Sequence, residues 1–174
     1  MKYCIPLLLA ILVVSCATNK PVEFSYSGTF KASLPINLMS GATVFTADAL
    51  SVKTHEGKTI SGVVAYREAD NLPEDFDMRS YPEIVFGLKE YTGSSAELME
   101  KFSNTRMAFE HSYDLTNVSA ENNNGVTRYS TCKHERCLGF VVKNSLPDHV
   151  LMVFTEGLAK KDFVKLLNGA FYVK

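Results

Sequence analysis

The sequence predicts an α+β fold, in which a mainly antiparallel sheet has two or three helices packed on it, including an amphipathic helix near the C-terminal end. Two observations lead to this prediction. Short segments rich in β-branched and aromatic residues, separated by turn residues, fill much of 24–67 and 126–154, which is typical of antiparallel strands. Apolar residues instead recur at helical spacings, four and seven positions apart within 94–109 and at i, i+3, i+4, i+7 and i+8 within 163–171, which is the pattern of an amphipathic helix.

Residues 1–15 are expected to be a signal peptide that precedes the domain. Lys2 gives this segment a charged start, and an uncharged apolar stretch covers 5–14. The stretch is much shorter than the roughly 20 residues that a membrane-spanning helix needs. Secretory signals have this layout of a charged start, a short apolar middle and small residues at the end.

The residues Val13, Val14, Ser15 and Cys16 resemble the lipobox of bacterial lipoproteins. In that family the cysteine thiol receives a diacylglycerol, the chain is cut before it, and the new amino terminus is usually acylated. The resemblance therefore implies a lipid anchor at Cys16. Ala17 follows, where an aspartate would retain a Gram-negative lipoprotein in the inner membrane, so the resemblance implies the outer membrane. An ordinary secreted protein and an uncleaved membrane anchor are the alternatives.

Residues 16–22 are then a lipidated tether, and residues 23–174 a single globular domain, long enough to bury a core. Fully extended, the tether reaches ~25 Å from the bilayer. The chain's 18 basic and 19 acidic side chains nearly cancel. This balance gives no electrostatic reason to expect a nucleic-acid partner, and lipid rather than charge would hold the protein at a membrane.

The first half of the domain is expected to be mostly strands, with Pro35 interrupting the β-rich stretch and Gly57 at the turn of a hairpin. Residues 68–77 form an acidic loop, for which solvation is the favoured interpretation and a bound cation the alternative. The strand-like segments are 24–34, 42–45, 49–54 and 59–67.

The middle of the chain is predicted to be helical. Ser80 with Glu83, and Ser94 with Glu97, have the spacing of capping boxes that open a short and a longer helix. The apolar residues expected to face the core from these helices are Ile84, Val85, Leu88, Leu98, Phe102 and Phe109.

The remaining elements are a loop over 116–125, a hairpin, a buried-looking strand over 149–154, and a closing helix. The hairpin has strand-like flanks on either side of Cys132 and Cys137. The apolar stripe of the closing helix consists of Phe163, Leu166, Leu167, Ala170 and Phe171.

Cys132 and Cys137 are expected to form a disulfide, because an exported protein meets an oxidising compartment. If the two cysteines face each other across a hairpin, they lie within disulfide reach. This register also places the apolar side chains of both flanks on one face. Those side chains are Tyr129, Leu138, Phe140 and Val142.

Two other roles for this hairpin remain open. Cys132, His134 and Cys137 could be metal ligands, with His111 or His149 as a fourth, although zinc sites usually show two tight ligand pairs. A redox site would favour two intervening residues rather than four. The four polar residues between the cysteines form a candidate recognition loop: Lys133, His134, Glu135 and Arg136.

The order of strands, helices, hairpin, buried strand and closing amphipathic helix resembles the Mog1/PsbP-like α+β domains, most closely over 149–173. That resemblance implies a sheet with helices packed on it and mostly binding or accessory roles.

No metalloprotease, serine-hydrolase or phosphate-loop motif is present in the sequence. We therefore expect no catalytic residue, no enzyme activity, no cofactor and no metal. The function expected is a non-catalytic binding or accessory module of the bacterial envelope. It would be anchored to the outer membrane, most simply on its periplasmic face, and would have a protein partner in the envelope. The alternative is a periplasmic inhibitor or immunity lipoprotein that neutralises a toxin or a hydrolase.

Overall fold

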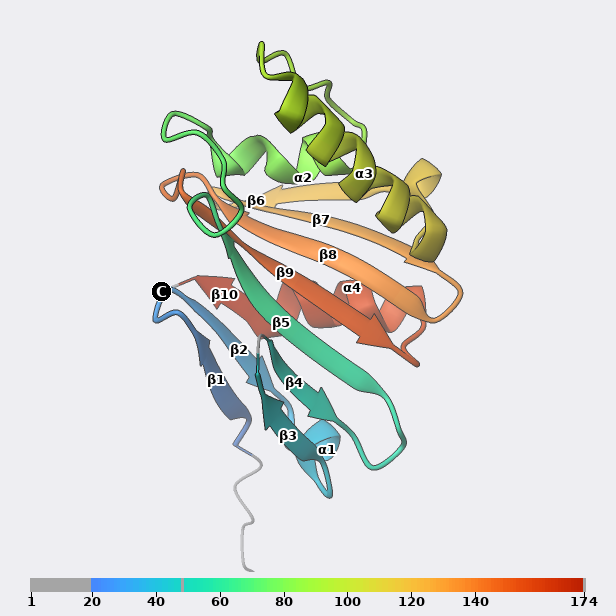
Figure 1. The fold of residues 1–174 in the computed structure, drawn as a ribbon. Coiled ribbons are helices and arrows are strands. Elements are labelled where there is room, and N and C mark those ends of the chain that lie inside the picture. The colour runs from blue at the N-terminus through green and yellow to red at the C-terminus, as the bar shows by residue number, and fades with distance from the viewer. Residues whose placement is uncertain (1–19, 48, 174) are drawn as a thin grey trace, which may run out of the picture.

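The computed structural model describes residues 20–47 and 49–173. The expected signal peptide, Cys16 and Ala17 lie outside this part of the chain. The described residues confirm the α+β class: helices cover two antiparallel sheets, and one amphipathic helix lies close to the C-terminal end (Figure 1). Within these residues no helix is long and apolar enough to cross a bilayer.

A seven-stranded antiparallel sheet forms the centre of the molecule, with the strand order β3-β4-β5-β9-β8-β7-β6. Its middle is built from the longest strands, and its two edges are formed by short strands with exposed residues. The strands are β3 (Thr43–Thr46), β4 (Leu50–Lys53), β5 (Thr59–Tyr66), β6 (Ser119–Asn123), β7 (Val126–Lys133), β8 (Arg136–Lys143) and β9 (His149–Glu156).

A second, three-stranded sheet has the order β1-β2-β10, so that the last strand of the chain joins the first hairpin. Its strands are β1 (Val22–Tyr26), β2 (Phe30–Leu34) and β10 (Phe171–Val173). The helical elements are α1 (Ile36–Met39), η1 (Met78–Ser80), α2 (Tyr81–Val85), α3 (Ala96–Ser112), η2 (Leu115–Asn117) and α4 (Lys160–Ala170).

Two hydrophobic cores lie on opposite faces of the large sheet. Helices α2 and α3 cover one face, and the small sheet together with α4 covers the other. Strands β8 and β9 contribute to both cores, because their successive side chains point to opposite faces. Leu138 and Val150, for example, belong to the first core, whereas Val141 and Leu151 belong to the second. A strand buried on both faces is expected to have a nearly continuous apolar sequence, as both strands do.

Several predicted elements are confirmed. Strands β4 and β5 form the predicted hairpin around Gly57, and the predicted strand at 149–154 is central and largely buried. Leu98 and Phe102 of α3 are buried and Phe109 is partly buried, as the helical stripe predicts.

The predicted helix caps are wrong in detail. The Ser95 hydroxyl, not that of Ser94, caps α3 by accepting a hydrogen bond from the Leu98 amide at 3.3 Å. The Ser80 side chain makes no capping bond to α2, and its hydroxyl donates to the Asp77 carbonyl oxygen instead. Leu88 lies beyond the end of α2 and is exposed.

Two element boundaries also differ from the prediction. The expected loop over 116–125 contains η2 and the edge strand β6, which pairs in register with β7. Helix α4 ends at Ala170, and Phe171 begins β10 rather than continuing the helical stripe. Phe171 is nevertheless buried, in the same core as the apolar residues of α4.

Candidate binding site at the disulfide hairpin

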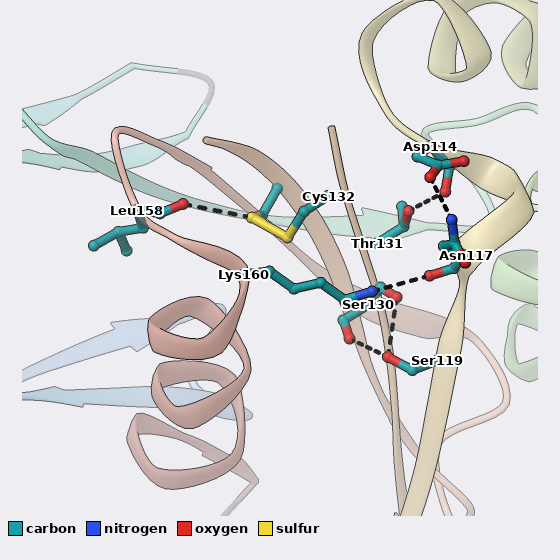
Figure 2. The surroundings of a disulfide bond; sticks show 9 residues. Asp114, Asn117, Ser119, Ser130, Thr131, Cys132, Leu158 and Lys160 are labelled. Carbon is teal, nitrogen blue, oxygen red and sulfur yellow. Dashed lines mark hydrogen bonds between the residues drawn. A yellow bond between two sulfur atoms is a disulfide. The ribbon is translucent and has the colours of Figure 1, made fainter. Parts of the chain in front are cut away.

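The predicted disulfide between Cys132 and Cys137 is present, and it closes the hairpin of β7 and β8 near its turn. The two residues face each other in the register that the sequence predicts, with Cα atoms 4.1 Å apart. Cys137 is fully buried, and its sulfur lies 3.8 Å from the carbonyl oxygen of Leu158 (Figure 2). Both cysteines are bonded to each other, so neither is free as a thiolate ligand for a metal.

The polar tip of the hairpin is more regular than the predicted four-residue loop. Lys133 and Arg136 still pair as strand residues, so only His134 and Glu135 form the turn. His134 has a left-handed backbone conformation, with φ of 57°. All four side chains from Lys133 to Arg136 are exposed, and the tip therefore presents them on a short, ordered scaffold.

The tip is attached to the rest of the molecule on two sides. Lys133 Nζ donates to the carbonyl oxygen of His111 at 3.2 Å, at the C-terminal end of α3. A cation is favoured at that end of a helix. On the other side, the Gly157 amide donates to the Glu135 carbonyl oxygen at 2.9 Å. These bonds hold the turn between α3 and the end of β9.

A second set of polar contacts supports β7 behind the tip (Figure 2). The Thr131 hydroxyl donates to the carbonyl oxygen of Asp114. The Asp114 carboxylate accepts from the side-chain amide of Asn117 at 2.6 Å and from the hydroxyl of Thr116 at 2.6 Å. These hydrogen bonds hold the pKa of Asp114 below its ordinary value. The segment between α3 and β6 is therefore fixed against the hairpin.

Two open hollows flank the tip. The first has a volume of about 620 Å³, and the second about 560 Å³. Lys133 and His134 line both of them. The first hollow is completed by His111, Ser112, Glu135, Arg136, Glu156 and Gly157. The second is completed by Arg106, Glu110, Tyr113, Asp114, Leu115, Thr116 and Cys132.

The surface around the tip carries charges of both signs. Arg136 and Glu156 form an exposed ion pair at 3.3 Å, and Arg106 and Glu110 form another at 2.8 Å on α3. Among the described residues, no group of three or more histidine, cysteine, aspartate or glutamate side chains is arranged to hold a metal ion. A surface with exposed charges of both signs can form complementary ion pairs with a bound molecule, and such pairs determine its orientation.

The structure places the two histidines that were considered as further metal ligands in different surroundings. His111 adjoins the tip, and its carbonyl oxygen accepts the hydrogen bond from Lys133. His149 begins β9, whereas Glu156 at the tip ends it, which separates the two by roughly 20 Å of extended strand. The His149 ring is buried against Phe30 and Tyr66, with Nδ1 bonded to Asp148 at 2.7 Å.

The residues that surround the tip from other elements are not predicted by the sequence. Glu156 is the last residue of β9 and Gly157 follows it, whereas Tyr113 and Asp114 follow α3. Each is an ordinary turn or strand-end residue in the sequence, so no local pattern distinguishes it. The pairing of β8 with β9 brings Glu156 opposite Arg136. The hydrogen bond from Thr131 to the Asp114 carbonyl oxygen brings the end of α3 to the hairpin.

Comparison of the chain with protein-family models, with curated proteins and with solved structures found no match. The resemblances to the lipobox and to the Mog1/PsbP-like domains therefore stay expectations from the sequence.

Proposed function

We propose that this protein is a lipid-anchored envelope lipoprotein whose domain is a non-catalytic binding module for a protein partner. The anchor would be the lipidated Cys16, in the outer membrane and on its periplasmic face. The partner would bind at the hairpin tip. The observation that carries the proposal is the ordered, charged tip between two open hollows, which a disulfide and contacts with α3 and Gly157 hold in place.

The order of the tip supports a binding role on physical grounds. Association loses free energy when flexible loops and side chains must be ordered at an interface. Here the backbone of the turn is already fixed by folding. The exposed side chains of His134, Glu135 and Arg136 are then available for contacts, and the neighbouring hollows can accept side chains of a partner.

Photo-crosslinking in the living cell tests the proposed binding surface. A photoreactive amino acid at Glu135 should give a discrete crosslinked product, and Arg136→Glu in the same protein should remove it. The Arg136–Glu156 pair is exposed on both sides, so its loss should leave the melting temperature almost unchanged.

Lys89→Glu is the matched control, because it makes the same change in net charge. Lys89 is exposed, and it lines a hollow together with Asp77. This hollow lies at the end of the β7–β8 hairpin opposite the tip, because Arg79, which is next to Asp77, donates a hydrogen bond to Asn144 just after β8. This variant should leave the crosslinked product intact. A product that survives Arg136→Glu, or that is lost equally in Lys89→Glu, would contradict the assignment of the tip.

Metabolic labelling tests the anchor separately. Cys16→Ser should abolish incorporation of labelled palmitate and leave an uncleaved precursor, and globomycin should cause the same precursor to accumulate in the wild type. Ala17→Asp should move the protein from the outer-membrane to the inner-membrane fraction. A wild-type protein that takes up no palmitate would overturn the lipoprotein assignment while leaving the binding surface to be judged by crosslinking.

An inhibitor or immunity lipoprotein is the second candidate. The two-residue turn at the tip, closed by a disulfide, favours it because inhibitors commonly present a rigid segment to an enzyme cleft. The identity of the crosslinked partner separates the two functions. An envelope component supports the accessory module, whereas a toxin or hydrolase whose activity falls on binding supports the inhibitor.

A further inference from the structure

Three exposed apolar side chains lie at the end of the molecule where β1 begins. Ile36, Val44 and Phe45 are exposed to 40%, 44% and 48%. The first residue of β1, Val22, pairs with Leu34 at the end of β2. Helix α1 starts two residues after Leu34 and leads into β3, so that α1, β3 and the start of β1 share one end of the molecule (Figure 1).

Strand β3 is an unusual edge strand for a protein surrounded by water. It forms one edge of the large sheet, and all four of its residues are exposed. Charged residues and prolines usually protect an edge strand from pairing with another chain. The sequence of β3, Thr43 to Thr46, contains neither. Val44 and Phe45 are successive strand residues and project to opposite faces. An occupant must therefore surround the edge rather than cover one face.

The position of the anchor determines which occupant is favoured, and this step rests on the lipid anchor proposed above. Val22 already belongs to β1, so the free tether is residues 16–21, which can extend to ~20 Å. A compact domain of this length is about 40 Å across. The tether is thus too short for the domain to turn its far side to the bilayer. The part of the domain around the start of β1 is therefore the part within reach of the bilayer, and it carries Ile36, Val44 and Phe45.

We infer that the α1–β3 end of the domain is a membrane-contacting surface, in which Ile36, Val44 and Phe45 enter the interfacial region of the bilayer. Burial of apolar side chains at the boundary between headgroups and acyl chains is favourable, and it adds to the anchoring by acyl chains. The domain then rests on the membrane in one orientation. A second copy of the chain, paired through β3, is the competing occupant.

Tryptophan fluorescence tests this orientation, because the chain contains no tryptophan of its own. The full lipidated chain carrying Phe45→Trp is reconstituted into phosphatidylcholine vesicles with and without brominated acyl chains. We expect the tryptophan to lose about half of its emission in the brominated vesicles, since bromine quenches only rings that reach the acyl boundary. Ile36→Trp provides a second probe should one variant fold poorly.

Met107→Trp is the matched control. Met107 is exposed to 56% and lies on α3, across the large sheet from the small sheet and α4. Its tryptophan should be equally bright in both kinds of vesicle.

Flotation of the vesicles separates failure of the inference from failure of the anchor. Protein that floats with the vesicles but shows no quenching at positions 45 and 36 overturns the membrane contact and leaves the anchor intact. Protein that does not float with the vesicles overturns both the membrane contact and the lipid anchor. A blue-shifted emission that bromine does not quench, and that grows with the protein-to-lipid ratio, would show that a second copy covers β3 and would overturn the inference.

Discussion

Arg128 connects the hairpin to the end of α4. Its Nε donates to the Leu167 carbonyl oxygen at 3.2 Å, and Nη2 donates to the Phe171 carbonyl oxygen at 3.1 Å. The last carbonyl groups of a helix have no partner within the helix, and here a cation from a strand supplies donors. Partial burial lowers the pKa of Arg128 despite the nearby carboxylate of Glu121, but an arginine remains charged.

We predict that Arg128→Gln lowers the free energy of unfolding by about 2 kcal/mol, because two charge-assisted hydrogen bonds to partly buried carbonyl groups are lost. Arg106→Gln is the control, since the Arg106–Glu110 pair is half exposed and should contribute less than about 0.5 kcal/mol. Urea unfolding followed by circular dichroism measures both values. Equal losses for the two variants would contradict the role given to Arg128.

A second prediction concerns how much the disulfide between Cys132 and Cys137 contributes to stability. Replacing both Cys132 and Cys137 by alanine should lower the free energy of unfolding by about 2 kcal/mol, as expected for a short closed loop, and should leave the protein folded. Alanine is preferable to serine at Cys137, because this side chain is fully buried and a hydroxyl there would lose its hydration. Thermal unfolding with and without a reductant checks the result, and the variant should no longer respond to the reductant.

At the scale of elements, the contact between α4 and the large sheet depends on a glycine in β8. A Cβ atom at Gly139 would lie 2.8 Å from Leu167, 2.9 Å from Phe163 and 3.1 Å from the Tyr129 carbonyl oxygen. Leu167 and Phe163 are themselves buried, so they have little room to move. The absence of a side chain at this position lets α4 lie directly on the strand.

We predict that Gly139→Ala destabilises the protein by about 1–3 kcal/mol, which is typical of overpacking. Gly169→Ala, in α4 itself, should instead stabilise it by roughly 0.5 kcal/mol, because the helix interior favours alanine and nothing lies within 4 Å of the added atom. The two variants make the same chemical change, and differential scanning calorimetry should show melting temperatures that move in opposite directions. A shift of the same sign in both would contradict the close packing at Gly139.

The elements that the sequence predicts best are those in which buried and exposed side chains alternate in one clear pattern. The register of β7 and β8 follows correctly from the alternation on both sides of Cys132 and Cys137. Strand β6 escapes prediction because it is an exposed edge with the sequence Ser119 to Asn123, and neither alternation nor β-propensity distinguishes it from a loop. Its strand structure comes from pairing with β7, which is a tertiary effect.

The ends of helices are predicted wrongly where the local sequence is compatible with two different conformations. Ser94 and Ser95 both have the hydroxyl that a helix cap uses, and in the structure Ser95 caps α3. Phe171 continues the apolar period of α4, but its backbone pairs with Ala32 of β2. For the binding surface, the sequence predicts the tip itself but not Glu156 or Asp114, because these residues are distant in the chain and join the site only through the fold.

For the whole molecule, charged groups at both ends of the β7–β8 hairpin couple stability to pH. Arg79 donates to both carboxylate oxygens of Asp77, at 2.8 Å and 2.6 Å, and Arg79 also donates to the Asn144 carbonyl oxygen at 2.7 Å. The side-chain hydrogen bonds from Arg79 hold the pKa of Asp77 below its ordinary value. At the other end, the hydrogen bonds from Asn117 and Thr116 do the same for Asp114.

We predict that stability is fully supported above the ordinary carboxyl pKa of 3.8 and declines as the pH falls through the lower folded values of Asp77 and Asp114. The sign follows because the folded state binds these protons less readily than the unfolded state does. Asp77→Asn combined with Asp114→Asn should be less stable than the wild type at about pH 6, and the difference should shrink at about pH 2. Urea unfolding at several pH values measures this, and a difference that does not depend on pH would contradict the assignment.

The burial of β8 and β9 on both faces has a consequence for the chain before it folds. In the native sheet, Val150 to Phe154 pairs with β5 and β8, and two cores shield its side chains. In the nascent chain, the same run is a stretch of strongly β-forming residues without charge or proline, which is the signature of segments that assemble into cross-β aggregates. The apolar run that joins the two cores of the folded protein is therefore an aggregation hazard for as long as the chain is unfolded.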